Sequence, residues 1–239
     1  NNLVNIEDIA GNLSIDRVTI GSTNFDDVTA SDTITIVASG GNLMTMATNG
    51  QISTTGDNDK ITLTSSDGSV TLSGSVTSDG GEIEINADTG ITLDNADSDI
   101  VSFMVAGQNT SGLIDVNADV DGDGSGTFTV SNAGASLDTD SGTDADIDIT
   151  GGDFDVSANA TIDAGSAVLR IAPSAAKAVT IGTGAGVMTF GISNVEINFV
   201  DEASSLVIGQ TEGSTTASSI TIDAAFNLST ITTVPGNVT

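Results

Sequence analysis

A short unit recurs along this chain from one end to the other. In each copy, an apolar residue, a polar residue and a second apolar residue are followed by Gly, Ser, Asp or Asn. Alternation with a period of two places the outer pair on one face of an extended strand and the middle residue on the other. Thr at the middle position suits a strand face that contacts water, because it is β-branched yet polar. The copies are 18–20, 34–36, 61–63, 70–72, 83–85, 91–93, 128–130, 147–149, 154–156, 169–171, 179–181, 195–197 and 220–222.

The spacing of these copies predicts how the strands are arranged. Apolar starts between Ile34 and Val70 recur about every nine residues, and a longer period of roughly 20 residues connects Ile61 to Ile83. Such a spacing is typical of a coil that carries two or three short strands, with turns at Gly, Asn and Asp. We therefore predict an all-β fold, a parallel β-solenoid with roughly 20 residues per coil and about ten to twelve coils, in a single domain over residues 1–239.

Two other architectures are disfavoured by the same pattern. No segment of about a dozen residues has apolar positions at helical spacing, so we expect no helix. The main rival is a string of two or three antiparallel sandwich domains. Sandwich strands are usually longer than these triplets, and such domains usually carry a buried Trp or Tyr. The chain contains neither residue type.

The charge of the chain is strongly one-sided. It carries 33 Asp and Glu residues against four Lys and Arg residues, for a formal net charge of -29. Such a surface repels nucleic acid and anionic lipid headgroups and attracts cations, so neither nucleic acid nor membrane insertion is expected of this segment. Hydrophobic residues make up 38% of the chain and follow regular patterns, which favours a folded core over disorder.

The ends of the chain and its lack of Cys give further expectations. The sequence starts at Asn1 without a Met, so we interpret it as a mature piece, or a segment of a longer secreted precursor. The absence of Cys indicates that the fold needs no disulfide. Residues 3–20 and 220–231 both look like ordinary repeat material rather than caps. Because open ends present unpaired strand edges, we expect self-association through the ends or edges.

Several segments carry a likeness to a known family. Gly11–Ile15, Gly68–Gly74, Asp88–Leu93 and Ser205–Gly209 resemble the coils of filamentous-haemagglutinin-like exoproteins and of large autotransporter passengers. The resemblance covers most of the chain and is one of pattern and composition. It implies a right-handed β-helix at the cell surface, with a role in adhesion, biofilm or display. It brings no catalytic residues, and the sequence lacks the amino-terminal secretion domain of that family.

The strongest local chemistry is an acidic run in the middle of the chain. Asp115, Asn117, Asp119, Asp121 and Asp123 alternate with other residues. Alternating oxygen ligands followed by Gly are what a calcium loop needs, since this cation takes about six to eight oxygens. Counted from Asn117, the twelfth position is Phe128 rather than the Glu of an EF-hand. The run therefore predicts a calcium loop that is not an EF-hand. The alternative is a solvated polar loop in a chain rich in Asp.

A second acidic run follows the first. It spans Asp138–Asp148 and would place like charges close together, which bound cations could relieve. The interpretation that we favour is a solvated face without a bound ion.

The residue types that carry most enzyme chemistry are absent or rare. The chain has no His, Cys, Trp or Tyr, from which enzymes draw many proton-transfer groups and nucleophiles. Asp88–Gly90 and Asp140–Gly142 have the form of aspartic-protease triplets, but chance explains them in a chain so rich in Asp, Ser, Thr and Gly. An acidic β-helix lyase needs a basic residue beside its carboxylates, and the four basic residues are scattered singly: Arg17, Lys60, Arg170 and Lys177.

The sequence thus predicts a non-enzymatic protein outside the cell. The first hypothesis is a structural subunit, secreted or at the cell surface, that builds a fibre, filament, matrix or surface layer. The alternative is an adhesin stalk or binding module that recognises glycan or another cell surface and is stabilised by calcium.

Overall fold

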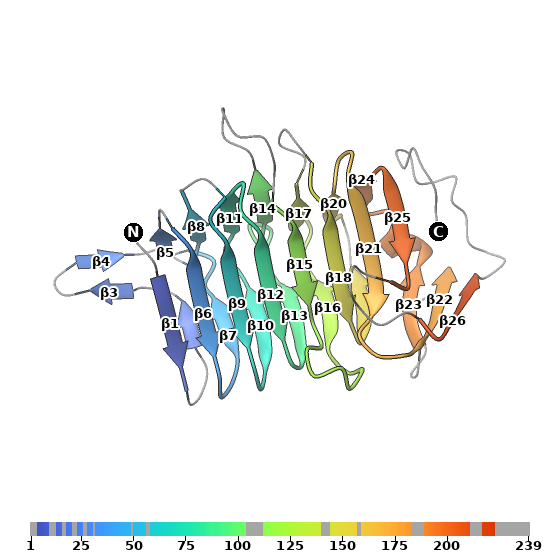
Figure 1. Cartoon of the computed structure of the whole chain (residues 1–239), viewed down its shortest axis with the longest axis horizontal. Coiled ribbons are helices and arrows are strands. Elements are labelled where there is room, and N and C mark those ends of the chain that lie inside the picture. The colour runs from blue at the N-terminus through green and yellow to red at the C-terminus, as the bar shows by residue number, and fades with distance from the viewer. Residues whose placement is uncertain are drawn as a thin grey trace.

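The computed structural model describes most of the chain. The described residues are 4–9, 13–15, 18–20, 23–25, 28–30, 32–48, 50–55, 58–103, 112–139, 144–156, 159–182, 189–210 and 217–222. Within them the fold is all-β, and most strands pair in parallel in long sheets (Figure 1). This part of the fold prediction is confirmed, and the antiparallel sandwiches are excluded for the described residues.

Three long sheets contain most of the strands. The first has eight strands in the order β1 (Val4–Asp8), β6 (Ile34–Ala38), β9 (Ile61–Ser65), β12 (Ile83–Ala87), β15 (Ile114–Asn117), β18 (Ile147–Gly151), β21 (Val168–Pro173) and β25 (Ser205–Ile208). The second has six, namely β2 (Leu13–Ile15), β7 (Leu43–Thr45), β10 (Ser69–Leu72), β13 (Gly90–Leu93), β16 (Thr127–Val130) and β19 (Asp153–Val156). The third has seven, namely β5 (Val28–Ala30), β8 (Ile52–Thr54), β11 (Val76–Asp79), β14 (Ile100–Phe103), β17 (Ser136–Asp138), β20 (Thr161–Asp163) and β24 (Val200–Glu202).

The chain visits these sheets in rotation. A strand of the first sheet is followed by one of the second and then one of the third, as in β6, β7 and β8, or β9, β10 and β11. We call such a set of three strands a circuit. Each strand pairs in parallel with its counterparts in the neighbouring circuits, so the backbone hydrogen bonds of the strands run between circuits.

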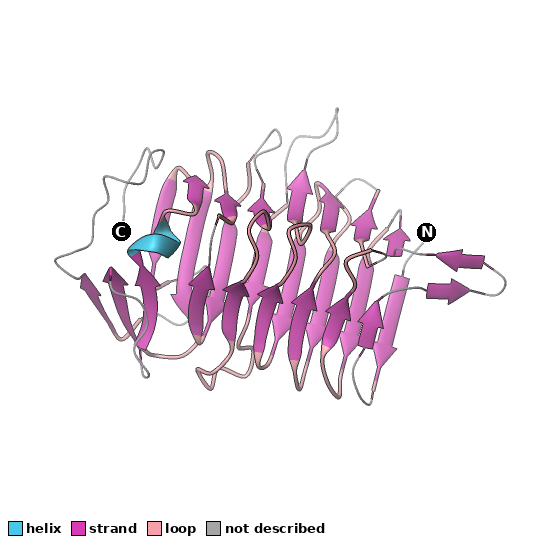
Figure 2. Cartoon of the chain, turned by 180° about the vertical axis from the view of Figure 1, so that it is seen from behind, coloured by secondary structure: helices cyan, strands magenta, loops and turns pink. Residues whose placement is uncertain are grey.

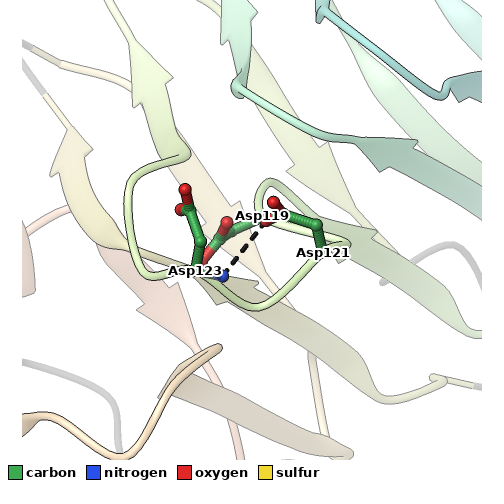
Figure 3. Close-up of side chains that lie close together, drawn as sticks. All are labelled: Asp119, Asp121 and Asp123. Carbon is green, nitrogen blue, oxygen red and sulfur yellow. Dashed lines mark hydrogen bonds between the residues drawn. The ribbon is translucent and has the colours of Figure 1, made fainter.

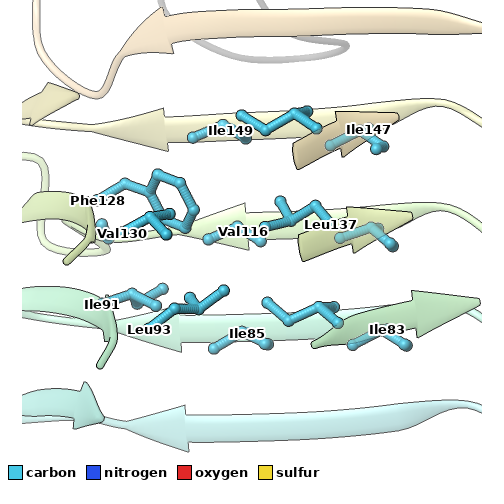
Figure 4. Packing of buried hydrophobic residues seen from close by; sticks show 14 of the residues in the cluster. Ile83, Ile85, Ile91, Leu93, Val116, Phe128, Val130, Leu137, Ile147 and Ile149 are labelled. Carbon is cyan, nitrogen blue, oxygen red and sulfur yellow. The ribbon is translucent and has the colours of Figure 1, made fainter. Parts of the chain in front are cut away.

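In-register pairing stacks the apolar residues of the repeat into continuous columns. Ile34, Ile61 and Ile83 pair in turn along the first sheet, and Ile114 and Ile147 continue the same column. All five side chains are 0% exposed. The intervening residues of β9 and β12 are only half-buried, as the alternation predicted. Figure 4 shows side chains from successive circuits filling one shared core. Full burial of an Ile side chain stabilises the fold by about 1.5–3 kcal/mol relative to exposure.

Buried hydroxyl groups satisfy the backbone where the chain turns between sheets. The Ser65 hydroxyl donates to the Gly41 carbonyl at 2.7 Å, and that of Ser98 donates to the Leu72 carbonyl at 2.7 Å. The Thr45 hydroxyl oxygen accepts from the Ser73 amide at 3.0 Å. A buried backbone group without a hydrogen-bond partner destabilises the fold. These small polar residues supply the partners, so the chain can turn sharply beside a narrow core.

The circuits are more variable than the repeat predicted. Counterparts one circuit apart are separated by 22 residues at Lys60 and Glu82 but by 37 at Ala167 and Ser204. The longest sheet has eight strands, so the described residues form fewer circuits than the ten to twelve expected for the chain. The strands keep their register because their side chains share the core, whereas the corners lie outside it and tolerate insertions.

One predicted repeat strand is a helical turn, and another is a strand that pairs outside the three long sheets. Residues 195–197 belong to α1 (Asn194–Ile197), a single helical turn, so both the strand predicted there and the absence of helix were wrong. The Ser193 hydroxyl accepts from the Glu196 amide at 3.2 Å, and the Glu196 carboxylate accepts from the Ser193 amide at 2.6 Å, which is a capping box. Residues 18–20 form β3 (Val18–Ile20), which pairs antiparallel with β4 (Thr23–Phe25) in a hairpin beyond β1 (Figure 1).

The other end of the molecule carries a small separate sheet. It consists of β23 (Thr189–Ser193), β22 (Ala178–Gly182) and β26 (Ser219–Ile222), all parallel. In the view from behind, α1 lies close to this end (Figure 2). Among the described residues, no helix has the length and apolar character needed to cross a membrane.

Candidate metal site at the corner between β15 and β16

Three of the predicted calcium ligands come together at one corner. Asp119, Asp121 and Asp123 lie in the turn that follows β15 and precedes β16, and one carboxylate oxygen from each lies within 4.8 Å of the other two (Figure 3). Asp119 is 1% exposed, whereas Asp121 and Asp123 are exposed. The group therefore has one buried ligand at its base and two at the surface.

The loop folds through hydrogen bonds from alternate side chains to the backbone. Asn117 Oδ1 accepts from the Asp119 amide at 3.2 Å, Asp121 Oδ1 from the Asp123 amide at 3.1 Å, and Asp123 Oδ1 from the Ser125 amide at 2.8 Å. Asp and Asn favour this turn, in which the side chain accepts from the amide two residues on. Successive turns of this kind gather the alternate side chains on one side of the loop.

Asp119 has two oxygens in different situations. Its Oδ2 accepts from the Gly124 amide at 2.7 Å and from the Ser174 hydroxyl. Its Oδ1 is buried without a hydrogen-bond partner. Burial raises the pKa of the Asp119 carboxyl, and the adjacent Asp121 carboxyl raises it further, against the lowering effect of the Ser174 hydrogen bond. The corner thus holds a buried carboxylate whose negative charge its surroundings do not fully compensate.

Negative charge from earlier circuits accumulates at the same corner. Asp88 lies at the corresponding corner one circuit back, and its pKa is raised by desolvation and then by Asp121 and Asp67. Hydrogen bonds from Ser125 lower the pKa of Asp123, and the positive charge of Lys177, from a later circuit, lowers it further. The Lys177 ammonium itself donates to the carbonyl oxygens of Gly124 and Gly152.

The other two predicted ligands have different places. Asn117 supports the loop by accepting from the Asp119 amide. Asp115 lies within β15, where it pairs in register between Glu84 of β12 and Asp148 of β18. It is not among the carboxylates of the Asp119 group. The sequence spacing grouped all five residues, but β15 continues to Asn117, so Asp115 projects from the sheet before the loop begins.

Asp115 is one of three acidic residues that lie side by side on neighbouring strands of the first sheet. Lys60 binds Glu84 at 2.6 Å on one side, and Arg170 binds Asp148 at 3.0 Å on the other. Asp115 lies between these two ion pairs. Burial raises its pKa to about 6, with further contributions from Asp148 and Glu84.

The charge on Asp115 should make the fold less stable at neutral pH. Its folded-state pKa is raised above the unfolded value of 3.8, so the penalty is small near pH 4, grows as the pH rises from there to about 6 and is complete above that. We expect Asp115→Asn to raise the free energy of unfolding by about 1–2 kcal/mol at pH 7.5, after allowance for solvent screening, and by little at pH 4. Urea unfolding followed by circular dichroism at both pH values measures this.

A matched control removes a charge elsewhere. Asp155→Asn removes an exposed carboxylate from β19. It should not reproduce the pH-dependent gain. If both substitutions stabilise the fold equally at pH 7.5, the cause is relief of the overall negative charge. The position of Asp115 between Glu84 and Asp148 is then not the cause.

The second acidic run, Asp138–Asp148, lies partly within the described residues. Asp144 and Asp146 accept from backbone amides of the next circuit, those of Ser166 at 2.5 Å and Val168 at 3.0 Å, and Asp146 also binds Arg170 at 2.6 Å. They therefore serve contacts between circuits. Residues 140–143, with the second aspartic-protease triplet, lie outside the described residues.

Two contacts of the site had no sequence signal. Ser174 and Lys177 lie in the corner between β21 and β22, more than 50 residues further along the chain, and reach Asp119 and Gly124 with separations of 55 and 53 residues. Only the stacking of circuits brings these corners together. No family model, curated protein or solved structure matches the chain, so the site rests on its own geometry.

Proposed function

We propose that the three sheets form one parallel β-solenoid and that this solenoid is a structural subunit of an extracellular fibre, filament or surface layer. The rotation of successive strands among the three sheets supports the coil. Strands of the first sheet point down at the front of Figure 1 while the chain advances from left to right, and the nearer strands of Figure 2 point up. This direction supports a right-handed coil as part of the proposal, and parallel crossover connections strongly favour that hand.

The observation that carries the structural role is the unbroken parallel ladder along the long axis of the molecule. Eight strands pair side by side in the first sheet, and each pairs only with the circuits next to it. A fold of this kind gains length by repetition and forms a stiff rod, because every added circuit buries its apolar column on the one before. Such a rod suits the subunit of a fibre or layer.

The outer edge of β1 offers the means of association. Val4 donates its amide to Thr33 at 3.2 Å, and Asp8 accepts from the Ser39 amide at 2.8 Å, so the even-numbered residues of β1 direct their backbone toward β6. The backbone groups of Asn5 and Glu7 consequently point away from β6. Within the described residues, β1 and β25 are the outermost strands of the first sheet. A second copy can therefore add its β25 edge to β1 and continue the sheet.

Removing one outward amide tests this association. Asn5→Pro deletes an N–H on the outer side of β1 and leaves the hydrogen bonds to β6 intact. We expect the wild-type chain to form rods that lengthen with concentration, and Asn5→Pro to associate at least about ten-fold more weakly. Sedimentation velocity over a range of concentrations and negative-stain microscopy measure both.

The control keeps the amide at the same position. Asn5→Thr retains the N–H and a polar, exposed side chain, so it should associate like the wild type. Thermal melts of all three proteins show whether the fold is equally stable. Strictly monomeric wild-type particles at every concentration would contradict the proposal, as would an Asn5→Pro variant that polymerises normally.

A further inference from the structure

We propose that Asp119, Asp121 and Asp123 bind a calcium ion, and that this ion holds together the corners of three successive circuits. The proposal is independent of end-to-end association, because these corners follow β15, β18 and β21, which are inner strands of the first sheet rather than its edge strands.

The geometry of the three carboxylates fits a single ion. Calcium binds oxygen at about 2.3–2.6 Å, so two of its ligands are at most about 5 Å apart. One oxygen from each of the three carboxylates lies within 4.8 Å of the others, which is inside that limit. Gly122 and Gly124 have φ values of 69° and 87°, and this left-handed backbone lets the loop turn tightly around the group.

A second observation points to a ligand independently of the clustering. Oδ1 of Asp119 belongs to a residue that is 1% exposed, yet it accepts no hydrogen bond. A buried carboxylate oxygen without a hydrogen bond or a cation is strongly unfavourable. Lys177, a cation that contacts this loop, directs its ammonium to the carbonyl oxygens of Gly124 and Gly152. A divalent ion held between Asp119 and the two exposed carboxylates satisfies the remaining oxygen.

The ligand set favours weak, calcium-type binding. Asp121 and Asp123 are exposed, so water can complete the coordination sphere. The position that holds a bidentate Glu in an EF-hand is Phe128, which is 0% exposed in the core and cannot contribute a ligand. Three carboxylates without that Glu suit a dissociation constant of about 10⁻⁴–10⁻³ M, the range of extracellular calcium modules.

The contacts around Asp119 explain how an ion would tie circuits together. The Ser174 hydroxyl donates to Asp119 Oδ2 from the corner between β21 and β22. Lys177 of the same corner bridges Gly124 and Gly152, and the Gly152 amide donates to the Gly126 carbonyl. The loop, the corner between β18 and β19, and the corner between β21 and β22 thus form one hydrogen-bonded stack. Fixing Asp119 and the loop fixes the attachment points of the other two corners.

Calorimetric titration with calcium chloride tests binding, using the full chain at pH 7.5 after treatment with a chelator. We expect one site with the affinity above, and a melting temperature higher by about 3–6 °C when free calcium is ten times the dissociation constant. The variant Asp121→Asn/Asp123→Asn should lose at least ten-fold in affinity. The control Asp97→Asn/Glu202→Gln removes the same charge from exposed positions elsewhere and should bind like the wild type.

Hydrogen exchange tests whether the ion holds the three corners together. Calcium should slow amide exchange in the loop and also around residues 174–177, and should not do so in the double Asn variant. The absence of binding at 5 mM calcium, about five times the weakest expected dissociation constant, overturns the site. Equal binding by the double Asn variant also overturns it. If calcium slows exchange only in the loop, the proposal that the ion holds the three corners together is wrong. Because both substituted side chains are exposed, the variant should fold, and its circular dichroism spectrum checks this.

Discussion

Replacing Phe128 by alanine should lower the free energy of unfolding by about 3–5 kcal/mol. Phe128 is 0% exposed and pairs in register with Phe154, which is 2% exposed. Their ring centroids are 5.9 Å apart, with an interplanar angle of 26°. The substitution leaves a cavity that the rigid strands on either side cannot close, and it removes a ring contact worth about 0.5–1.5 kcal/mol. Urea unfolding followed by circular dichroism measures the loss.

The neighbouring outward residue provides the control. Thr129→Ala alters the half-buried face of the same strand and should change stability by less than about 1 kcal/mol. A double-mutant cycle with Phe154→Ala isolates the contact between the rings. If Phe128→Ala costs less than about 1 kcal/mol, the two rings do not share a well-packed core and the in-register stack of β16 on β19 is wrong.

Replacing Gly126 by alanine should lower the free energy of unfolding by about 3 kcal/mol or more and should displace the loop of the proposed calcium site. A Cβ atom at this position would overlap the carbonyl oxygen of Ala118, on the opposite side of the loop. Both partners are backbone, so neither can move aside without opening the corner, and the result resembles severe overpacking. We expect a lower melting temperature and, in calorimetric titration, calcium affinity reduced by at least ten-fold.

Gly122 separates the effect of the clash from that of backbone conformation. Its φ is 69°, but a Cβ there would come only within 3.8 Å of the Ser174 carbonyl oxygen. Gly122→Ala should therefore cost about 1–2 kcal/mol, from the left-handed conformation alone. If the two variants prove equally stable, close approach of the loop to itself at Gly126 is not a constraint on the fold.

The alternation of apolar and polar residues predicted the strands correctly where the apolar residues face the shared core. Strands such as β9 and β12 lie where their triplets predicted, because only a pleated strand buries both outer residues and leaves Thr or Glu in water. Residues 195–197 have the same pattern but form α1. Three residues are too few for alternation to distinguish a strand from a helical turn. The sequence Ser193–Glu196 carried the better signal, the spacing of a capping box.

The candidate site was predictable in part for a similar reason. Asp119, Asp121 and Asp123 lie within one loop, where local turn chemistry decides their arrangement. Asp115 lies only four residues before Asp119 along the chain but belongs to β15, and the end of that strand is set by its pairing with β18. Ser174 could not be linked to the site from sequence, because variable corner lengths hide which corners stack.

The sequence by itself determined that this chain forms short strands with one apolar face, that its net charge is strongly negative, and that its central Asp run forms an acidic loop. These properties follow from local alternation and charge. Only the tertiary structure decided the rotation among three sheets, the in-register columns of Ile, and the contact of Ser174 and Lys177 with the Asp119 loop. Those features depend on which circuits become neighbours, and that is fixed by packing across the whole core rather than by any single segment.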